Sequence, residues 1–147
     1  MSIEESNQTE LQLYTRRTRC FVSFPYDVKL VDTVRQMQNR WWTPKTREWS
    51  FDVSCHDAFI AAHPTTIELK HDMYIYKTKQ NVYFKFIETH NLDELTQLLG
   101  NVEYDPDGHV FVISPSEYTK LEEYVQQKGL KAMMRNFEQV CTIKRKI

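Results

Sequence analysis

Apolar and polar residues alternate with a period of two in several short segments. Between these segments, apolar residues recur every three or four positions, as on one face of a helix. In the first half of the chain the alternation covers residues 20–24 and 49–53, which predicts half-buried β-strands. Between them Leu30, Val34 and Met37 recur at the spacing of an amphipathic helix. An extended stretch at residues 11–16 comes first, and a second helix is expected after residue 53. The predicted order is strand, strand, helix, strand, strand, helix.

The same order recurs 62 residues further along the chain. This shift aligns residues 13–62 with 75–124 without a gap and matches "TPKT" to "DPDG", both turn sequences. We therefore expect an α+β fold of two tandem ββαββα repeats, with antiparallel sheets and helices packed on one face of each. The predicted boundaries are 1–64 and 65–128 for the repeats and 129–147 for a basic tail, with residues 63–66 as the linker.

The charge of the chain is close to balanced but unevenly distributed. The net charge is −1, yet residues 12–62 carry +3, residues 74–124 carry −5 and residues 125–147 carry +5. A phosphate-binding face is therefore expected on the first repeat or on the tail. No apolar run is long enough for a membrane span, and Cys20, Cys55 and Cys141 are too few and too scattered for a disulfide framework. These features favour an intracellular protein, in the nucleus or the cytoplasm and not secreted, with no membrane partner.

All three tryptophans lie in the segment "RWWTPKTREWSF", residues 40–51. Trp42 and Trp49 align with Tyr104 and Phe111 of the second copy, so both are interpreted as core residues of a hairpin. Trp41 aligns with Glu103, so the fold does not require a large apolar side chain at that position.

Trp41 should point to the opposite face of its strand from Trp42. On that face the next strand has Glu48 and Ser50, where the second copy has Val110 and Val112, so we expect the face to be open to solvent in the first repeat. An exposed Trp41 beside Arg40, Lys45 and Arg47 suits base stacking. Packing of Trp41 between the copies or in a homodimer is an equal alternative.

Two further groups are candidates for nucleic-acid contacts. Arg16, Arg17 and Arg19 crowd the first hairpin turn, where basic side chains can follow a phosphate backbone; a merely solvated turn is the alternative. Phe21, on the non-core face, extends the aromatic platform or packs between the repeats. The tail at residues 143–147 adds positive charge.

The quoted segments resemble the HARP domain of annealing helicases and related small DNA-recognition domains beside helicase motors. The resemblance covers residues 19–62 and, more faintly, 81–124. It rests on three motifs: Phe24-Pro25-Tyr26, Trp42-Thr43-Pro44 and Trp49-Ser50-Phe51. Such domains occur in tandem and contribute binding to single-stranded or forked DNA. The position before Trp-x-Pro, often basic in the family, is Trp41 here.

The resemblance implies a binding module and not an ATPase, because 147 residues could not hold a helicase motor and no phosphate-cradling glycine-rich loop occurs. No histidine, cysteine or carboxylate spacing indicates a metal, a cofactor or a catalytic set. We therefore expect a non-enzymatic nucleic-acid-binding protein, with DNA preferred to RNA, that acts in replication or repair, with a viral and a cellular origin as alternatives. The alternative is a protein-interaction adaptor or inhibitor that uses the same aromatic face.

Overall fold

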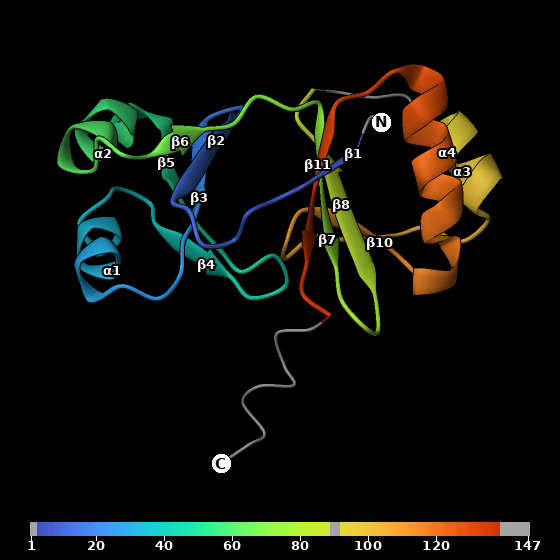
Figure 1. The fold of residues 1–147 in the computed structure, drawn as a ribbon, viewed down its shortest axis with the longest axis horizontal. Helices are drawn as coiled ribbons and strands as arrows, with labels where there is room; N and C mark the ends of the chain where they lie inside the picture. Colours follow the sequence, from blue (N-terminus) through green and yellow to red (C-terminus); the bar gives the residue numbers. More distant parts are fainter. Residues whose placement is uncertain (1–2, 89–91, 139–147) are drawn as a thin grey trace, which may run out of the picture. The chain divides into compact units, whose positions relative to one another are not determined.

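A computed structural model of the protein describes residues 3–88 and 92–138. The chain divides into two compact units: the N-terminal unit is residues 7–70, and the C-terminal unit is residues 1–6 together with 71–147. The start of the chain therefore belongs with its second half, which differs from the predicted boundaries at residues 64 and 128. Each unit combines one sheet with two α-helices, so the α+β class is confirmed (Figure 1).

The N-terminal unit has a five-stranded sheet in the order β4-β5-β3-β2-β6. Its elements are β2 (Gln12–Arg16), β3 (Arg19–Ser23), α1 (Val28–Arg35), β4 (Trp41–Thr43), β5 (Glu48–Asp52), α2 (His56–Ala62) and β6 (Ile67–Glu68). A short 3-10 turn, Val53–Cys55, joins β5 to α2. Strand β4 is at one edge of the sheet, so only one of its sides is paired.

The core of this unit lies between the sheet and its helices. Alternation places Leu13, Cys20 and Val22 on one face of the sheet, where they pack with Val34 of α1 and Phe59 of α2. Helix α1 begins where the Asp27 side chain accepts hydrogen bonds from the backbone N–H groups of Lys29 and Leu30, an N-cap that satisfies two otherwise unpaired donors. The helices thus cover one face only, as the sequence pattern predicts.

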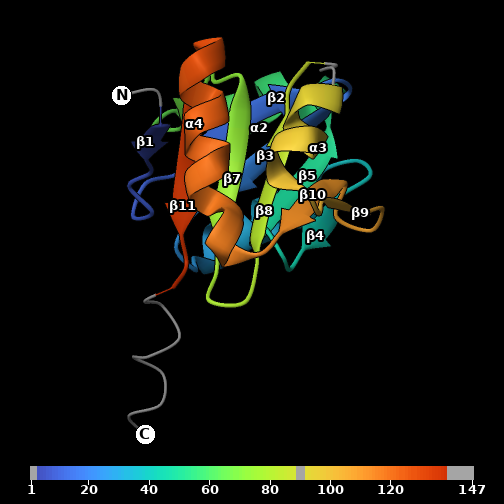
Figure 2. The same ribbon diagram turned by 90° about the vertical axis from the view of Figure 1, so that its right-hand side faces the viewer.

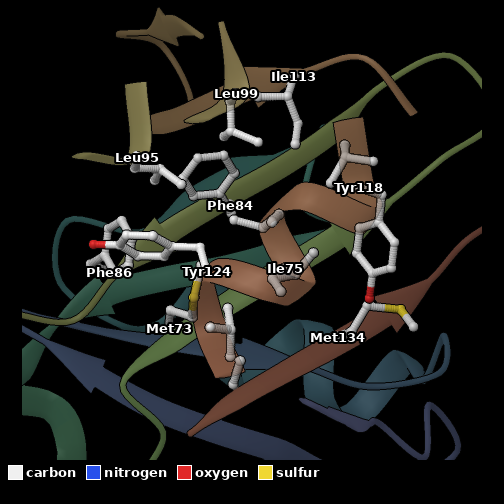
Figure 3. Packing of buried hydrophobic residues seen from close by; sticks show 14 residues of the cluster. Met73, Ile75, Phe84, Phe86, Leu95, Leu99, Ile113, Tyr118, Tyr124 and Met134 are labelled. Carbon is white, nitrogen blue, oxygen red and sulfur yellow. The ribbon is translucent and has the colours of Figure 1, made fainter. Parts of the chain in front are cut away.

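The C-terminal unit has a six-stranded sheet in the order β1-β11-β7-β8-β10-β9. Its elements are β1 (Ile3–Glu5), β7 (Met73–Lys77), β8 (Val82–Phe86), α3 (Asp93–Leu99), β9 (Glu103–Asp105), β10 (Val110–Ile113), α4 (Tyr118–Lys128) and β11 (Ala132–Asn136). Figure 2 shows α3 and α4 side by side over this sheet. Leu95, Leu99 and Tyr124 from these helices meet Phe84 and Ile75 of the strands (Figure 3).

Each unit contains a strand that the sequence pattern did not predict. In each, a strand follows the second helix and pairs in parallel with the first strand of the hairpin, β6 with β2 and β11 with β7. The helix returns the chain to the other end of the sheet, so the next strand runs parallel. The sheets are therefore mixed rather than antiparallel throughout. Residues 132–136 of the expected basic tail form β11 in the interior of a sheet, whereas residues 139–147 lie outside the described residues.

The two units share their element order up to the second helix. They also share a backbone detail at the turn before the last hairpin strand, where Arg47 (φ 54°) and His109 (φ 55°) both adopt the left-handed conformation. This region is unfavourable for residues with a Cβ atom and is most common in turns. The duplication itself stays a prediction.

Candidate nucleic-acid interface

Edge strand β4 exposes two tryptophans, one on each face of the sheet. Trp41 is 61% exposed and Trp42 is 42% exposed. Trp42 points to the helix-bearing face, where its ring lies 5.3 Å from that of Trp49 at an angle of 52°. The prediction that Trp42 is a core residue is therefore wrong in part: it packs on Trp49 as expected, but no strand lies beyond it to cover its outer side.

A transverse row of side chains crosses the other face of the sheet. The register pairs Trp41 with Ser50, Ser50 with Phe21, and Phe21 with Tyr14. The rings of Phe21 and Tyr14 are stacked, with centroids 5.1 Å apart. Trp41 and Phe21 are therefore on one face, separated by the width of two strand spacings, roughly 10 Å.

This face is not open as expected. Glu48 is 1% exposed and Ser50 is 2% exposed, and the Tyr14 hydroxyl donates a hydrogen bond to Glu48 Oε1 at 3.1 Å. A buried carboxylate requires such partners, because burying even a neutral polar group without a hydrogen bond costs about 2–7 kcal/mol and an unpaired carboxylate costs far more. The accessible part of the row is its outer end, at Trp41, and Phe21 is only partly exposed.

Four arginines gather at one end of the sheet. Arg16 and Arg19 pair across the hairpin turn, and Arg17, within that turn, has a φ of 57°. Arg40 directly precedes β4, whose chain enters the sheet at the same end, because β3 begins and β5 ends there. We call this group, Arg16, Arg17, Arg19 and Arg40, the arginine end.

The members of the arginine end differ in what they contact. Among the described residues, Arg17 and Arg40 are exposed and are not part of any ion pair. Arg19 is half-buried and donates hydrogen bonds to Ser50 Oγ and to the carbonyl oxygen of Asn39. The guanidinium groups of Arg17 and Arg40 are thus available to an anionic ligand, whereas that of Arg19 forms hydrogen bonds within the unit.

Lys45 and Arg47 lie away from the arginine end. They are in the turn between β4 and β5, and the register places this turn beside the C-terminal end of β3. The predicted basic residues therefore fall into two groups at opposite ends of the sheet, with Trp41 between them on the edge strand. Tyr26, at the same end as Lys45, is 83% exposed; sequence reasoning quoted it only as part of a motif.

The ionisable groups of this unit report its local environment. Burial raises the pKa of the Cys20 thiol. Hydrogen bonds from the Ser54 side chain and backbone lower the pKa of the Asp52 carboxyl, and the Arg19 guanidinium acts in the same direction. Hydrogen bonds to Asp57 and Glu68 raise the pKa of His56.

No cluster of three His, Cys, Asp or Glu side chains that could hold a metal ion occurs within residues 3–88 and 92–138. No helix there is long and apolar enough to cross a membrane. Cys20 and Cys55 are free thiols, and Cys141 lies outside the described residues.

Sequence reasoning missed the residues that support the site rather than those that form it. Asn39 (φ 59°) shapes the loop before Arg40, and Ser50 accepts from Arg19. Asparagine tolerates the left-handed conformation, so its presence ahead of a strand was the available signal.

Comparison with known proteins gives a family match within the N-terminal unit. The family model described as HepA-related protein (HARP) matches residues 21–69, about a third of the chain, and lies within the N-terminal unit. Neither a curated protein nor a solved structure gives a significant match. The matched family is a small DNA-binding module rather than a catalytic domain. Residues 21–69 are therefore similar to a HARP domain, and the match begins at Phe21 within β3 and includes both tryptophans of β4 and all of β6.

Proposed function

We propose that the N-terminal unit binds single-stranded or forked DNA through Trp41 and the arginine end, and that the chain is a binding protein and not an enzyme. The observation that carries this proposal is the 61% exposure of Trp41 on an edge strand that begins at the arginine end. An exposed aromatic ring beside cationic groups is the combination that single-strand binding uses.

The two parts of the interface contribute differently. Stacking of a base on an aromatic side chain is worth about 1–3 kcal/mol and does not depend on which base it is. Each phosphate neutralised by Arg17 or Arg40 releases condensed counterions, so the logarithm of the affinity falls with the logarithm of salt concentration, by about 0.7 per contact for a single strand. Lys45 and Arg47, at the other end of β4, extend the path of the backbone along the edge.

The remaining features of the protein fit this proposal. The C-terminal unit is a second copy of the ββαββα arrangement that has lost most of its basic character, and the role of the chain lies in replication or repair. No cofactor is needed for such a function.

A binding panel tests the proposal. Fluorescence anisotropy would be measured with labelled single-stranded, duplex and forked DNA and with single-stranded RNA, each at several salt concentrations. Micromolar or tighter binding to single-stranded and forked DNA, weaker binding to duplex DNA and RNA, and a steep salt dependence are expected. Lys29→Ala, an exposed residue at the start of α1, a helix that packs on the opposite face of the sheet from Trp41, is the matched control and should bind as the wild type does.

A protein partner is the second candidate. Exposed tryptophans on both faces of an edge strand also suit the addition of a strand from another polypeptide, including a second copy of this chain. In that case Trp41→Ala would change the oligomeric state or the capture of a partner, and nucleic-acid affinity would be absent or unaffected by the substitution.

A further inference from the structure

Arg19 makes three hydrogen bonds to groups within its own unit. Its Nε and Nη2 atoms donate to Ser50 Oγ at 3.2 and 2.9 Å, and Nη2 also donates to the carbonyl oxygen of Asn39 at 2.5 Å. A guanidinium group can reach two acceptors at once because its N–H donors have a rigid, fork-like geometry.

The two acceptors lie on either side of Trp41. Asn39 is two residues before it in the chain, and Ser50 is its cross-strand partner on β5. Arg19 therefore connects the loop that leads into β4 with the strand that β4 pairs with. Arg40 and Trp41, two residues of the proposed interface, directly follow Asn39, and Trp41 pairs with Ser50.

The loop needs such a connection. Asn39 has a φ of 59°, a left-handed conformation that turns the chain immediately before Arg40. The preceding residue, Gln38, is held by two hydrogen bonds: its N–H donates to Cys55 Sγ at 3.4 Å, and its carbonyl accepts from the Asp52 N–H at 2.9 Å. The Arg19 contact extends this support by one residue, up to the exposed pair.

We infer that Arg19 is a positioning residue, which holds Arg40 and Trp41 in their binding orientation, and that it is not a phosphate ligand. This inference rests on the proposed function and deepens it. It also corrects the expectation that all arginines of the first hairpin turn contact phosphate. Arg17 and Arg40 supply the charge, and Arg19 supplies the geometry.

The C-terminal unit lacks the same device. The positions 62 residues after Arg19 and Ser50 are Asn81 and Val112, and a valine side chain has no hydrogen-bond acceptor. Asn81 instead forms backbone hydrogen bonds with Thr78 inside the β7–β8 turn, and its side chain donates to the Tyr83 hydroxyl. The hydrogen bonds from Arg19 to Ser50 and Asn39, which we call the Arg19 clamp, thus have no equivalent at these positions of the C-terminal unit. They occur in the unit that carries the exposed Trp41.

The test compares Arg19→Ala, Arg19→Lys and Arg17→Ala in a salt series with labelled single-stranded DNA. A positioning role predicts that both Arg19 variants lose affinity about 3- to 10-fold, the scale of ordering a side chain on binding, while the slope of affinity against salt stays at the wild-type value. Arg17→Ala should reduce that slope by about 0.7. Lysine keeps the positive charge but lacks the fork-like arrangement of N–H donors, so Arg19→Lys should not restore the affinity that Arg19→Ala loses.

Two results would overturn the inference alone. One is wild-type affinity of Arg19→Lys. The other is a slope reduction in Arg19→Ala equal to that of Arg17→Ala, which would make Arg19 a phosphate ligand.

Amide hydrogen exchange of the free protein provides a readout independent of the ligand. Arg19→Lys and Ser50→Ala, which removes an acceptor without changing any charge, should both speed exchange at residues 38–41 and leave that of β7 and β8 unchanged. Unchanged exchange in both variants would contradict the clamp even if affinity fell. If the wild type binds no oligonucleotide, the proposed function fails, and faster exchange would then show a clamp that serves the fold alone.

Discussion

The two units share a hairpin, but they present different chemistry at its edge. In the N-terminal unit, Trp42 packs on Trp49 with ring centroids 5.3 Å apart; in the C-terminal unit, Tyr104 packs on Phe111 at 5.2 Å. The residue before this pair is Trp41 in one unit and Glu103 in the other, and both are exposed. What recurs in both units is therefore what the hairpin requires, and what differs is available for function.

The charges next to the two edges follow the same division. Edge strand β4 is flanked by Arg40 and Lys45, whereas β9 contains Glu103 and Asp105 and is followed by Asp107. A carboxylate-rich edge repels a phosphate backbone, so the C-terminal edge is not expected to bind nucleic acid. We therefore expect binding in the N-terminal unit, and the C-terminal unit serves as a built-in control.

The largest expected effect is on the stability of the N-terminal unit, through its hydrophobic core. Phe51 is fully buried, and its ring lies 5.3 Å from that of Phe59, so Phe51→Ala should lower the free energy of unfolding by about 3–5 kcal/mol. Because all three tryptophans are in the N-terminal unit, their fluorescence in a urea titration reports the unfolding of that unit. A loss below about 1 kcal/mol would mean that the hairpin does not depend on this contact.

Trp41 and Glu103 test the difference directly. Trp41→Ala should weaken single-stranded DNA binding by about 1–3 kcal/mol, the worth of one stacked base. Its effect on unfolding should stay within about 0.5 kcal/mol, as for other surface substitutions. Glu103→Ala, at the equivalent exposed position, should change neither quantity. Equal loss of binding in both variants, measured by anisotropy, would remove the distinction between the units.

Arg17 and Arg40 should act through salt dependence. The double variant Arg17→Ala/Arg40→Ala is expected to reduce the slope of log affinity against log salt by about 1.4, two single-strand contacts. Replacing Lys79 and Lys120 of the C-terminal unit with alanine provides a control with the same change in net charge. A slope that falls equally in the control would indicate a diffuse electrostatic effect instead of two contacts.

The smallest expected effect is on the pH dependence of stability. His56 lies between Asp57 and Glu68, and its pKa is raised by hydrogen bonds to both. The resulting stabilisation is fully present below the pKa of an unfolded histidine and is lost as the pH rises through the higher pKa of the folded state. Because this site is partly exposed to solvent, the stabilisation should amount to less than about 1 kcal/mol.

The C-terminal unit has Tyr118 at the equivalent position, and burial raises the pKa of this tyrosine to about 12. It therefore does not titrate near neutral pH. His56→Gln should remove the change in stability between pH 6 and pH 8, as measured by urea unfolding at each pH. An unchanged pH profile would show that His56 does not contribute.

The sequence predicted the parts of this structure that depend on local patterns. Period-two alternation placed Cys20 and Val22 in the core, and it placed Trp41 on the opposite face of its strand from Trp42. These predictions succeed because side-chain direction along a strand is fixed by backbone geometry.

The sequence could not give the features that depend on strand order. Strand β6 is two residues long and β11 follows a predicted helix, so neither has a clear alternating pattern in the sequence. The edge position of β4, which leaves Trp42 exposed, is known only from the order of strands in the sheet. The buried Glu48 likewise has its hydrogen-bond partner, Tyr14, 34 residues away in the chain. Such long-range contacts have no local signature, which is why the expected open face was wrong.

The most direct test of the central claim is a salt titration of single-stranded DNA binding with wild type and Trp41→Ala side by side. We predict that the wild type binds with a steep negative slope, and that Trp41→Ala has the same slope but an affinity about 5- to 150-fold lower, the equivalent of one stacked base. Wild-type binding that is absent at micromolar protein, or that is equal in the two proteins at every salt concentration, would contradict the account.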